Sequence, residues 1–107
     1  MILLFLFALI VPYYSSIKIN DNIEKHLEYL LVNVFYQNIF YKDDEVLLNE
    51  KNIKDIMMYY LKNLLSNYHT ISSIKVGFYF ENLKMQCSLN YLNYSYPFQI
   101  TKEVYYE

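Results

Sequence analysis

The hydrophobic and polar positions of this 107-residue chain follow different periods in different parts of the sequence. The sequence opens on a continuous apolar run, Met1–Val11, and its first charged side chain is Lys18. Apolar residues then recur at helical spacing, and from Ile71 onward apolar and polar residues alternate. We therefore predict an α+β fold in which an N-terminal apolar (membrane) helix precedes two amphipathic helices packed on a three-stranded antiparallel sheet.

The apolar head, residues 1–17, is expected to lie at a membrane. As a helix, Met1–Val11 would cover about 16 Å and the whole head about 25 Å, against the roughly 30 Å of hydrocarbon in a bilayer. Tyr13 and Tyr14 suit the membrane interface, where amphipathic rings are enriched. We predict a membrane anchor or signal-like segment at 1–17. The alternatives are a cleaved signal, a start that lies inside a longer chain, and a buried core helix.

The first amphipathic helix is predicted at residues 21–41. Asp21 and Glu24 have the spacing of a capping box, which would begin the helix at Asp21. If the residues just before Asp21 are also helical, the head and this helix form one long rod bent near Pro12. Residues 42–45, with the sequence Lys-Asp-Asp-Glu, are expected to be a solvated linker, because they lack the spaced ligands and central glycine of a calcium loop.

The second amphipathic helix is predicted at residues 50–67, with Asn49 or Asn52 as its N-cap. Its apolar residues lie on one side, and its other side is polar and carries three lysines, at 51, 54 and 62. The run Met57–Tyr60 allows two interpretations. It could line an adaptable groove, since methionine-rich surfaces fit varied partners, but packing in the core is favoured.

Strands are predicted at residues 73–81, 83–91 and 98–106. In the first strand, alternate residues from Ile74 to Phe80 are apolar. A two-residue turn at Glu81-Asn82 would pair Phe80 with Leu83, and all four apolar pairs of the hairpin would then share one face. Residues 91–96 are expected to form a loop.

The third strand carries one charge, Lys102, on an otherwise apolar face. A charge on the inner face is typical of an edge strand that resists adding a neighbour. The same strand could equally be one that accepts a strand from a partner chain. The sequence leaves both interpretations open.

The composition limits the classes of function. Apolar residues make up 55% and aromatic residues 20%, which is too hydrophobic for a disordered chain. A net charge of −2 and the absence of arginine argue against nucleic-acid binding. Cys87 has no partner for an internal disulfide and is expected to point into the core. His26 and His69 lack further ligands at metal-binding spacing. We therefore expect a non-enzymatic protein with no catalytic, cofactor-binding or metal-binding residue and no small-molecule substrate.

The order of these elements resembles that of pilins and pseudopilins, in particular the TadE-like membrane-anchored proteins of tight-adherence pilus systems. The residues that carry the resemblance are the head, the helix from Asp21 and the closing strands Ile74–Glu81, Leu83–Asn90 and Phe98–Glu107. It implies a membrane-anchored structural or assembly subunit of a bacterial surface or secretion apparatus. Its α+β domain, residues 18–107, would lie outside the cytoplasm beside other small anchored subunits. The resemblance transfers no site residue.

The alternative is a membrane-tethered protein-binding module or a small viral membrane protein. A binding module would use tyrosines as its contact surface, because tyrosine is favoured at interfaces. The candidates are Tyr79, Tyr91, Tyr94, Tyr96 and Tyr105. An enzyme ranks last, since no nucleophile stands near a base.

Overall fold

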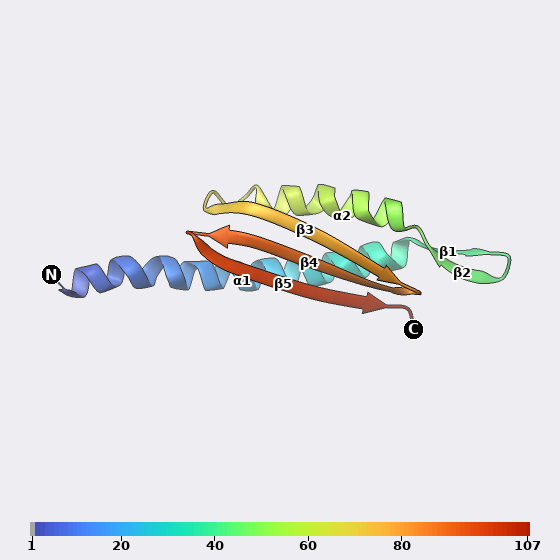
Figure 1. The fold of residues 1–107 in the computed structure, drawn as a ribbon, viewed down its shortest axis with the longest axis horizontal. Helices are drawn as coiled ribbons and strands as arrows, with labels where there is room; N and C mark the ends of the chain where they lie inside the picture. Colours follow the sequence, from blue (N-terminus) through green and yellow to red (C-terminus); the bar gives the residue numbers. More distant parts are fainter. Residues whose placement is uncertain (1) are drawn as a thin grey trace.

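The computed structural model describes the backbone of residues 2–107 and the side chains of residues 12–107. The molecule is elongated, 71 × 22 × 17 Å, with the N-terminal part of the first helix projecting from one end and a small hairpin from the other (Figure 1). Its elements are α1 (Ile2–Gln37), β1 (Ile39–Lys42), β2 (Glu45–Leu48), α2 (Glu50–Leu65), β3 (Ile71–Glu81), β4 (Lys84–Asn93) and β5 (Tyr96–Tyr105).

Two layers make up the fold. An antiparallel sheet with the strand order β3-β4-β5 forms one layer, and α1 and α2 form the other. The face of the sheet toward the helices, here called the inner face, is apolar, and the outer face is largely polar. The core lies between the layers and consists of Ile23, Leu27, Leu31, Val34, Phe35, Ile53, Met57, Leu61, Leu65, Met85, Cys87, Leu89, Tyr91, Ile100 and Val104. Within residues 12–107, β3 is the one strand of this sheet that contributes nothing to that buried set.

The first helix differs from the prediction in its extent. α1 is continuous from Ile2 to Gln37, so the head and the helix predicted at 21–41 form one element, as the long-rod alternative expected. Asp21 and Glu24 lie inside α1, and the predicted capping box is therefore wrong. A capping box serves N–H groups that have no carbonyl partner, whereas the helical turn before Asp21 already supplies carbonyls.

The predicted apolar membrane helix is corrected as well. The side chains of Met1–Val11, on which that prediction depended, lie outside the described residues. In the described part of the chain, no helix is long and apolar enough to cross a membrane. The physical reason is that α1 becomes amphipathic: Lys18, Asp21 and Lys25 are exposed, and the apolar side of the helix packs into the core.

The linker predicted at 42–45 is instead the tip of a hairpin formed by β1 and β2. Asp43 and Asp44 form its two-residue turn, with φ angles of 53° and 67°. Aspartate tolerates this left-handed conformation better than most residues, because its short side chain hydrogen-bonds locally. The helix predicted to reach residue 41 therefore ends at Gln37, and β1 follows directly.

The β3–β4 hairpin keeps the predicted faces but not the predicted register. Its turn is Asn82-Leu83, so that Glu81 pairs with Lys84 and Phe78 with Cys87. This register differs by two residues from the predicted one, and a shift of two leaves every side chain on its face. Asn82 takes the left-handed conformation of the turn, with φ 55°.

The loop predicted at residues 91–96 is mostly strand, because β4 runs to Asn93 and β5 begins at Tyr96. Only Tyr94 and Ser95 form the turn, with φ angles of 51° and 71°. A left-handed backbone costs an ordinary residue about 1–2 kcal/mol, and glycine avoids this cost.

We therefore expect the Ser95→Gly variant to be more stable than the parent chain by about 1 kcal/mol. The matched control is Ser88→Gly, which places glycine in the middle of β4 and is expected to lose about 1 kcal/mol. Urea denaturation of the two variants measures both effects. Equal destabilisation by the two glycines would contradict the turn geometry.

Candidate interaction site at the edge of the sheet

Within the described residues, the side chains that could act as nucleophiles or metal ligands do not lie together in one site. Cys87 is buried in the core, and burial raises the pKa of its thiol from 9.0 to about 12. His26 is exposed, and its Nδ1 lies 2.8 Å from the carbonyl oxygen of Asn22. Among the described residues, no group of three His, Cys, Asp or Glu side chains could hold a metal ion.

The raised pKa of Cys87 predicts how stability depends on pH. Because the folded state holds the thiol proton more tightly than the unfolded state, the stabilisation is complete below pH 9 and is lost between about pH 9 and 12. In that window, the free energy of unfolding should fall by up to about 1.4 kcal/mol per pH unit. A Cys87→Val variant should lose this part of the slope in urea denaturation at successive pH values. An unchanged slope would show that the thiol is not the titrating group.

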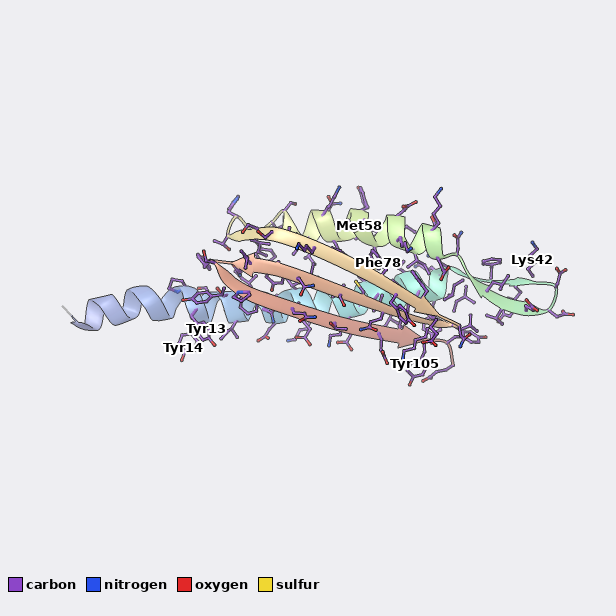
Figure 2. All side chains as sticks on the ribbon, in the orientation of Figure 1. Tyr13, Tyr14, Lys42, Met58, Phe78 and Tyr105 are labelled. Atoms are coloured by element: carbon purple, nitrogen blue, oxygen red, sulfur yellow. The ribbon has the colours of Figure 1, made fainter. Side chains whose placement is uncertain are left out.

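The five tyrosines that were predicted to form one contact surface do not do so. Tyr91 is buried, and its hydroxyl donates to Asn20 Oδ1 at 2.6 Å. Tyr96 packs edge-on against Tyr13 of α1, with 5.4 Å between the ring centres. Figure 2 shows Tyr105 and Tyr13 in separate parts of the molecule. The exposed members of the set are Tyr79, Tyr94 and Tyr105. The prediction of a single tyrosine surface is wrong.

The edge of the sheet at β5 carries an ion-paired charge on its inner face. Lys102 Nζ lies 2.8 Å from Glu24 Oε1 and 3.7 Å from Glu28 Oε2, both on α1. The hydrogen bond to Glu24 raises the pKa of the lysine above its usual value. An inward-pointing charge held in this way disfavours the addition of another strand. Of the two interpretations that the sequence left open, the geometry favours the protected edge.

The opposite edge of the sheet, at β3, has no charged residue on its inner face. β3 pairs with β4 alone, and its pairing is regular from Lys75 to Glu81, a stretch we call the free edge. A bulge at Ser73, where φ is 53°, limits this stretch on the N-terminal side. The inner-face residues of β3 are all apolar, and none is fully buried. They are Ile74, Val76, Phe78 and Phe80.

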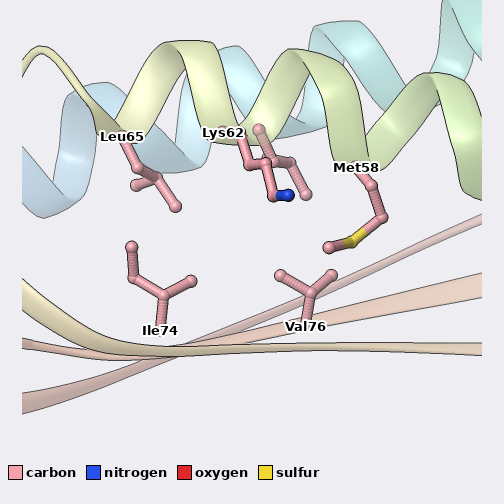
Figure 3. Close-up of a pocket in the computed structure, with 6 residues that line it drawn as sticks. Met58, Lys62, Leu65, Ile74 and Val76 are labelled. Carbon is pink, nitrogen blue, oxygen red and sulfur yellow. The ribbon is translucent and has the colours of Figure 1, made fainter.

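A groove runs between the free edge and α2 (Figure 3). Met58 and Lys62 point down from the helix toward Ile74 and Val76 on the strand, and the groove holds a hollow of about 200 Å³. Met58 is 36% exposed and Ile74 is 46% exposed, so apolar surface faces solvent on both sides. Figure 2 labels Met58 on α2 and Phe78 on the neighbouring strand β3.

The helix that forms one wall of the groove is fixed at its N-terminus. Asn49 caps α2, as predicted, by accepting a hydrogen bond from the Asn52 backbone N–H at 3.2 Å. The Asn52 side-chain amide donates to Asn38 Oδ1, and the Asn38 amide donates to the Val34 carbonyl oxygen of α1 at 2.7 Å. This chain of hydrogen bonds connects the N-terminal end of α2 to α1.

Two lysines flank the groove along α2. Lys54 Nζ lies 5.6 Å from the centre of the Phe80 ring, and Lys62 lines the hollow. None of the ion pairs formed within residues 12–107 involves either lysine. The groove therefore combines an apolar floor, a strand edge with free backbone groups and unpaired positive charge.

Some features of this groove could be predicted from the sequence. For the run Met57–Tyr60, packing in the core was the favoured prediction. Met57 is buried, whereas Met58 lines the groove and Tyr59 and Tyr60 are exposed. The spacing of Lys54, Met58 and Lys62 at every fourth position places them on one side of the helix. What the sequence could not show is that this side faces the free edge.

Comparisons with known proteins add no further support for a family. No family model matches this chain, and no curated protein or solved structure matches it. The description of the chain as a pilin-like membrane protein depended on the membrane helix that the described residues do not contain.

Proposed function

We propose that this chain is a non-enzymatic protein-binding module that takes up an extended segment of another protein as an added strand along β3. The observation that carries the proposal is the difference between the two edges of the sheet. β5 has the ion-paired Lys102 on its inner face, whereas the free edge of β3 has only apolar residues there. An edge strand that has an uncharged inner face and no pairing partner on one side is a template for a further strand.

Two kinds of interaction would support such binding. The backbone N–H and C=O groups of the free edge that point away from β4 would form hydrogen bonds with the added strand. Alternate side chains of that strand would enter the groove. Apolar surface on Ile74 and Met58 that now faces solvent would be buried. The proposal gives the chain a role in assembly with other protein subunits.

A second copy of this chain is a poorer occupant than a peptide segment. α2 stands over β3, so pairing two copies edge to edge would bring two α2 helices to about the spacing of neighbouring strands, roughly 5 Å. Packed helices need 8–10 Å between their axes. An extended segment without a covering helix avoids this clash.

The test uses a fluorescein-labelled peptide, Thr-Val-Thr-Val-Thr-Val-Thr, titrated with the full chain by fluorescence anisotropy. We expect saturable binding. Methylating the backbone nitrogens of either the valines or the threonines removes the donors from one edge of the peptide. One of the two methylated peptides should therefore lose binding, and the other should keep it. Equal binding by both would contradict strand addition.

Two variants locate the binding at the free edge. Ile74→Lys places a charge in the groove and should weaken binding by about tenfold or more. Gly77→Lys is the matched control, because it adds the same charge to the outer face of β3, where an added Cβ has no non-neighbouring heavy atom within 4 Å. Equal weakening by both variants would contradict the site. In sedimentation velocity, a dimer abolished by Ile74→Lys would show that a second copy occupies the edge.

A further inference from the structure

We infer that the segment bound at β3 carries two acidic residues four positions apart with an apolar residue midway between them, all on one face of the strand. This inference rests on the proposed function and names the chemistry of its partner. The observations behind it are the unpaired lysines of α2 and the apolar hollow that lies between them.

The positions of the two lysines give the spacing. Lys54 and Lys62 are eight residues apart on α2, which corresponds to about 12 Å along the helix axis. In an extended strand, residues i and i+4 share a face and lie about 13 Å apart. Because α2 runs along β3, two acidic side chains at i and i+4 of an added strand would reach the two lysines together.

The residue midway between the two acids would face the hollow. Met58 lies midway between Lys54 and Lys62 on α2, and it points toward Val76 across the groove (Figure 3). An apolar side chain at i+2 would contact Met58 and Val76 and would occupy part of the hollow of about 200 Å³. The pattern is therefore acidic-x-apolar-x-acidic.

The other charges near the groove are consistent with this pattern. Lys51 falls on the same stripe of α2 by the helical period and adds positive charge at its N-terminal end. On β3, Lys75 and Glu81 belong to the outer face and offset one another. Two exposed carboxylates lie on the same part of α2: Glu50 is four residues before Lys54, and Asp55 falls about 20° from Lys62 by the same helical period. Because three lysines stand against these two carboxylates, the wall that an added strand would meet is net positive.

Two isomeric peptides test the inference: Thr-Glu-Thr-Val-Thr-Glu-Thr and Thr-Thr-Glu-Val-Glu-Thr-Thr. They have the same composition and charge, but only the first places both glutamates on the same face as the valine. We expect the first to bind the full chain about fivefold or more tightly than the second at low ionic strength. Added salt should reduce this preference.

Variants of the chain complete the test. Changing Lys54→Gln and Lys62→Gln together should bring the two isomers to within about twofold of each other. Lys42→Gln is the control, since it removes one lysine at the tip of the β1–β2 hairpin, far from the groove (Figure 2), and should keep the preference. If both isomers bind equally to the parent chain, the inference is wrong and strand addition stands. If neither isomer nor the neutral threonine-valine peptide binds, the proposed function itself fails.

Discussion

The Lys102→Val variant is expected to bind the threonine-valine peptide along β5 as well as along β3. Within the described residues, Lys102 is the only charge on the inner face of β5, and its ion pairs with Glu24 and Glu28 hold it there. Valine would complete an apolar face and leave β5 as a second edge without protection. The free energy of unfolding should change by less than about 1 kcal/mol, because the glutamates are largely exposed and solvent screens the pair.

Titration of the variant with the fluorescein-labelled peptide, at concentrations well above the dissociation constant, gives the number of peptides bound, and we expect two per chain where the parent chain binds one. Lys102→Arg keeps the charge and should behave like the parent chain. Lys84→Val is a second control, because it removes a lysine that pairs with Glu103 at 3.4 Å on the outer face. If Lys102→Val and Lys84→Val bind the same number of peptides, the inner-face charge is not what protects β5.

The Phe35→Ala variant is expected to lose about 3–5 kcal/mol of the free energy of unfolding, the usual cost of truncating a buried aromatic ring. Phe35 is fully buried near the C-terminal end of α1, within the core between the helices and the sheet. A small domain has a total stability of about 5–15 kcal/mol, so this loss removes a large part of it. The melting temperature should fall by roughly 15–30 °C.

Thermal unfolding followed by circular dichroism measures the loss. Tyr29→Ala is the matched control, because it truncates an aromatic ring on the same helix that is 75% exposed. This variant should stay within about 0.5 kcal/mol of the parent chain. Similar losses in both variants would contradict the assignment of the core to the inner side of α1.

The strands were easier to predict than their pairing. Alternation from Ile74 to Phe80 determines which residues share a face, and the structure keeps those faces. The register depends on which two residues form the turn, and Glu81-Asn82 and Asn82-Leu83 satisfy the same alternation. The choice between them depends on the left-handed conformation of Asn82 and on the pairing of Glu81 with Lys84.

The extent of α1 and the small β1–β2 hairpin could not be predicted from local sequence patterns, because both depend on the neighbouring segments of the chain. Asp21 and Glu24 match a capping box, but such a box acts only where a helix begins. Asp43-Asp44 was interpreted as a solvated linker, although the apolar residues on both sides of it pair across the turn. In both places, the residue type was compatible with two local structures, and the neighbouring segments decided between them.

The candidate site was only partly visible in the sequence because it depends on how two layers meet. The apolar residues of β3 were predicted to share one face of the hairpin, and that shared face is confirmed. Their partial exposure follows from the position of β3 at the edge of the sheet, where α2 leaves one side open. By contrast, the charge of Lys102 on the inner face of β5 was visible in the sequence, and its partners on α1 are what the structure adds.

Hydrogen exchange of the backbone amides tests the central claim most directly. The full chain is labelled with ¹⁵N, and amide exchange is followed by NMR with and without the threonine-valine peptide. The account predicts that alternate amides between Lys75 and Glu81 become protected, since these N–H groups would donate to the added strand. Amides of β5 should exchange at unchanged rates. Protection that appears on β5, or a lack of any change along β3 while the peptide is bound, would contradict the account.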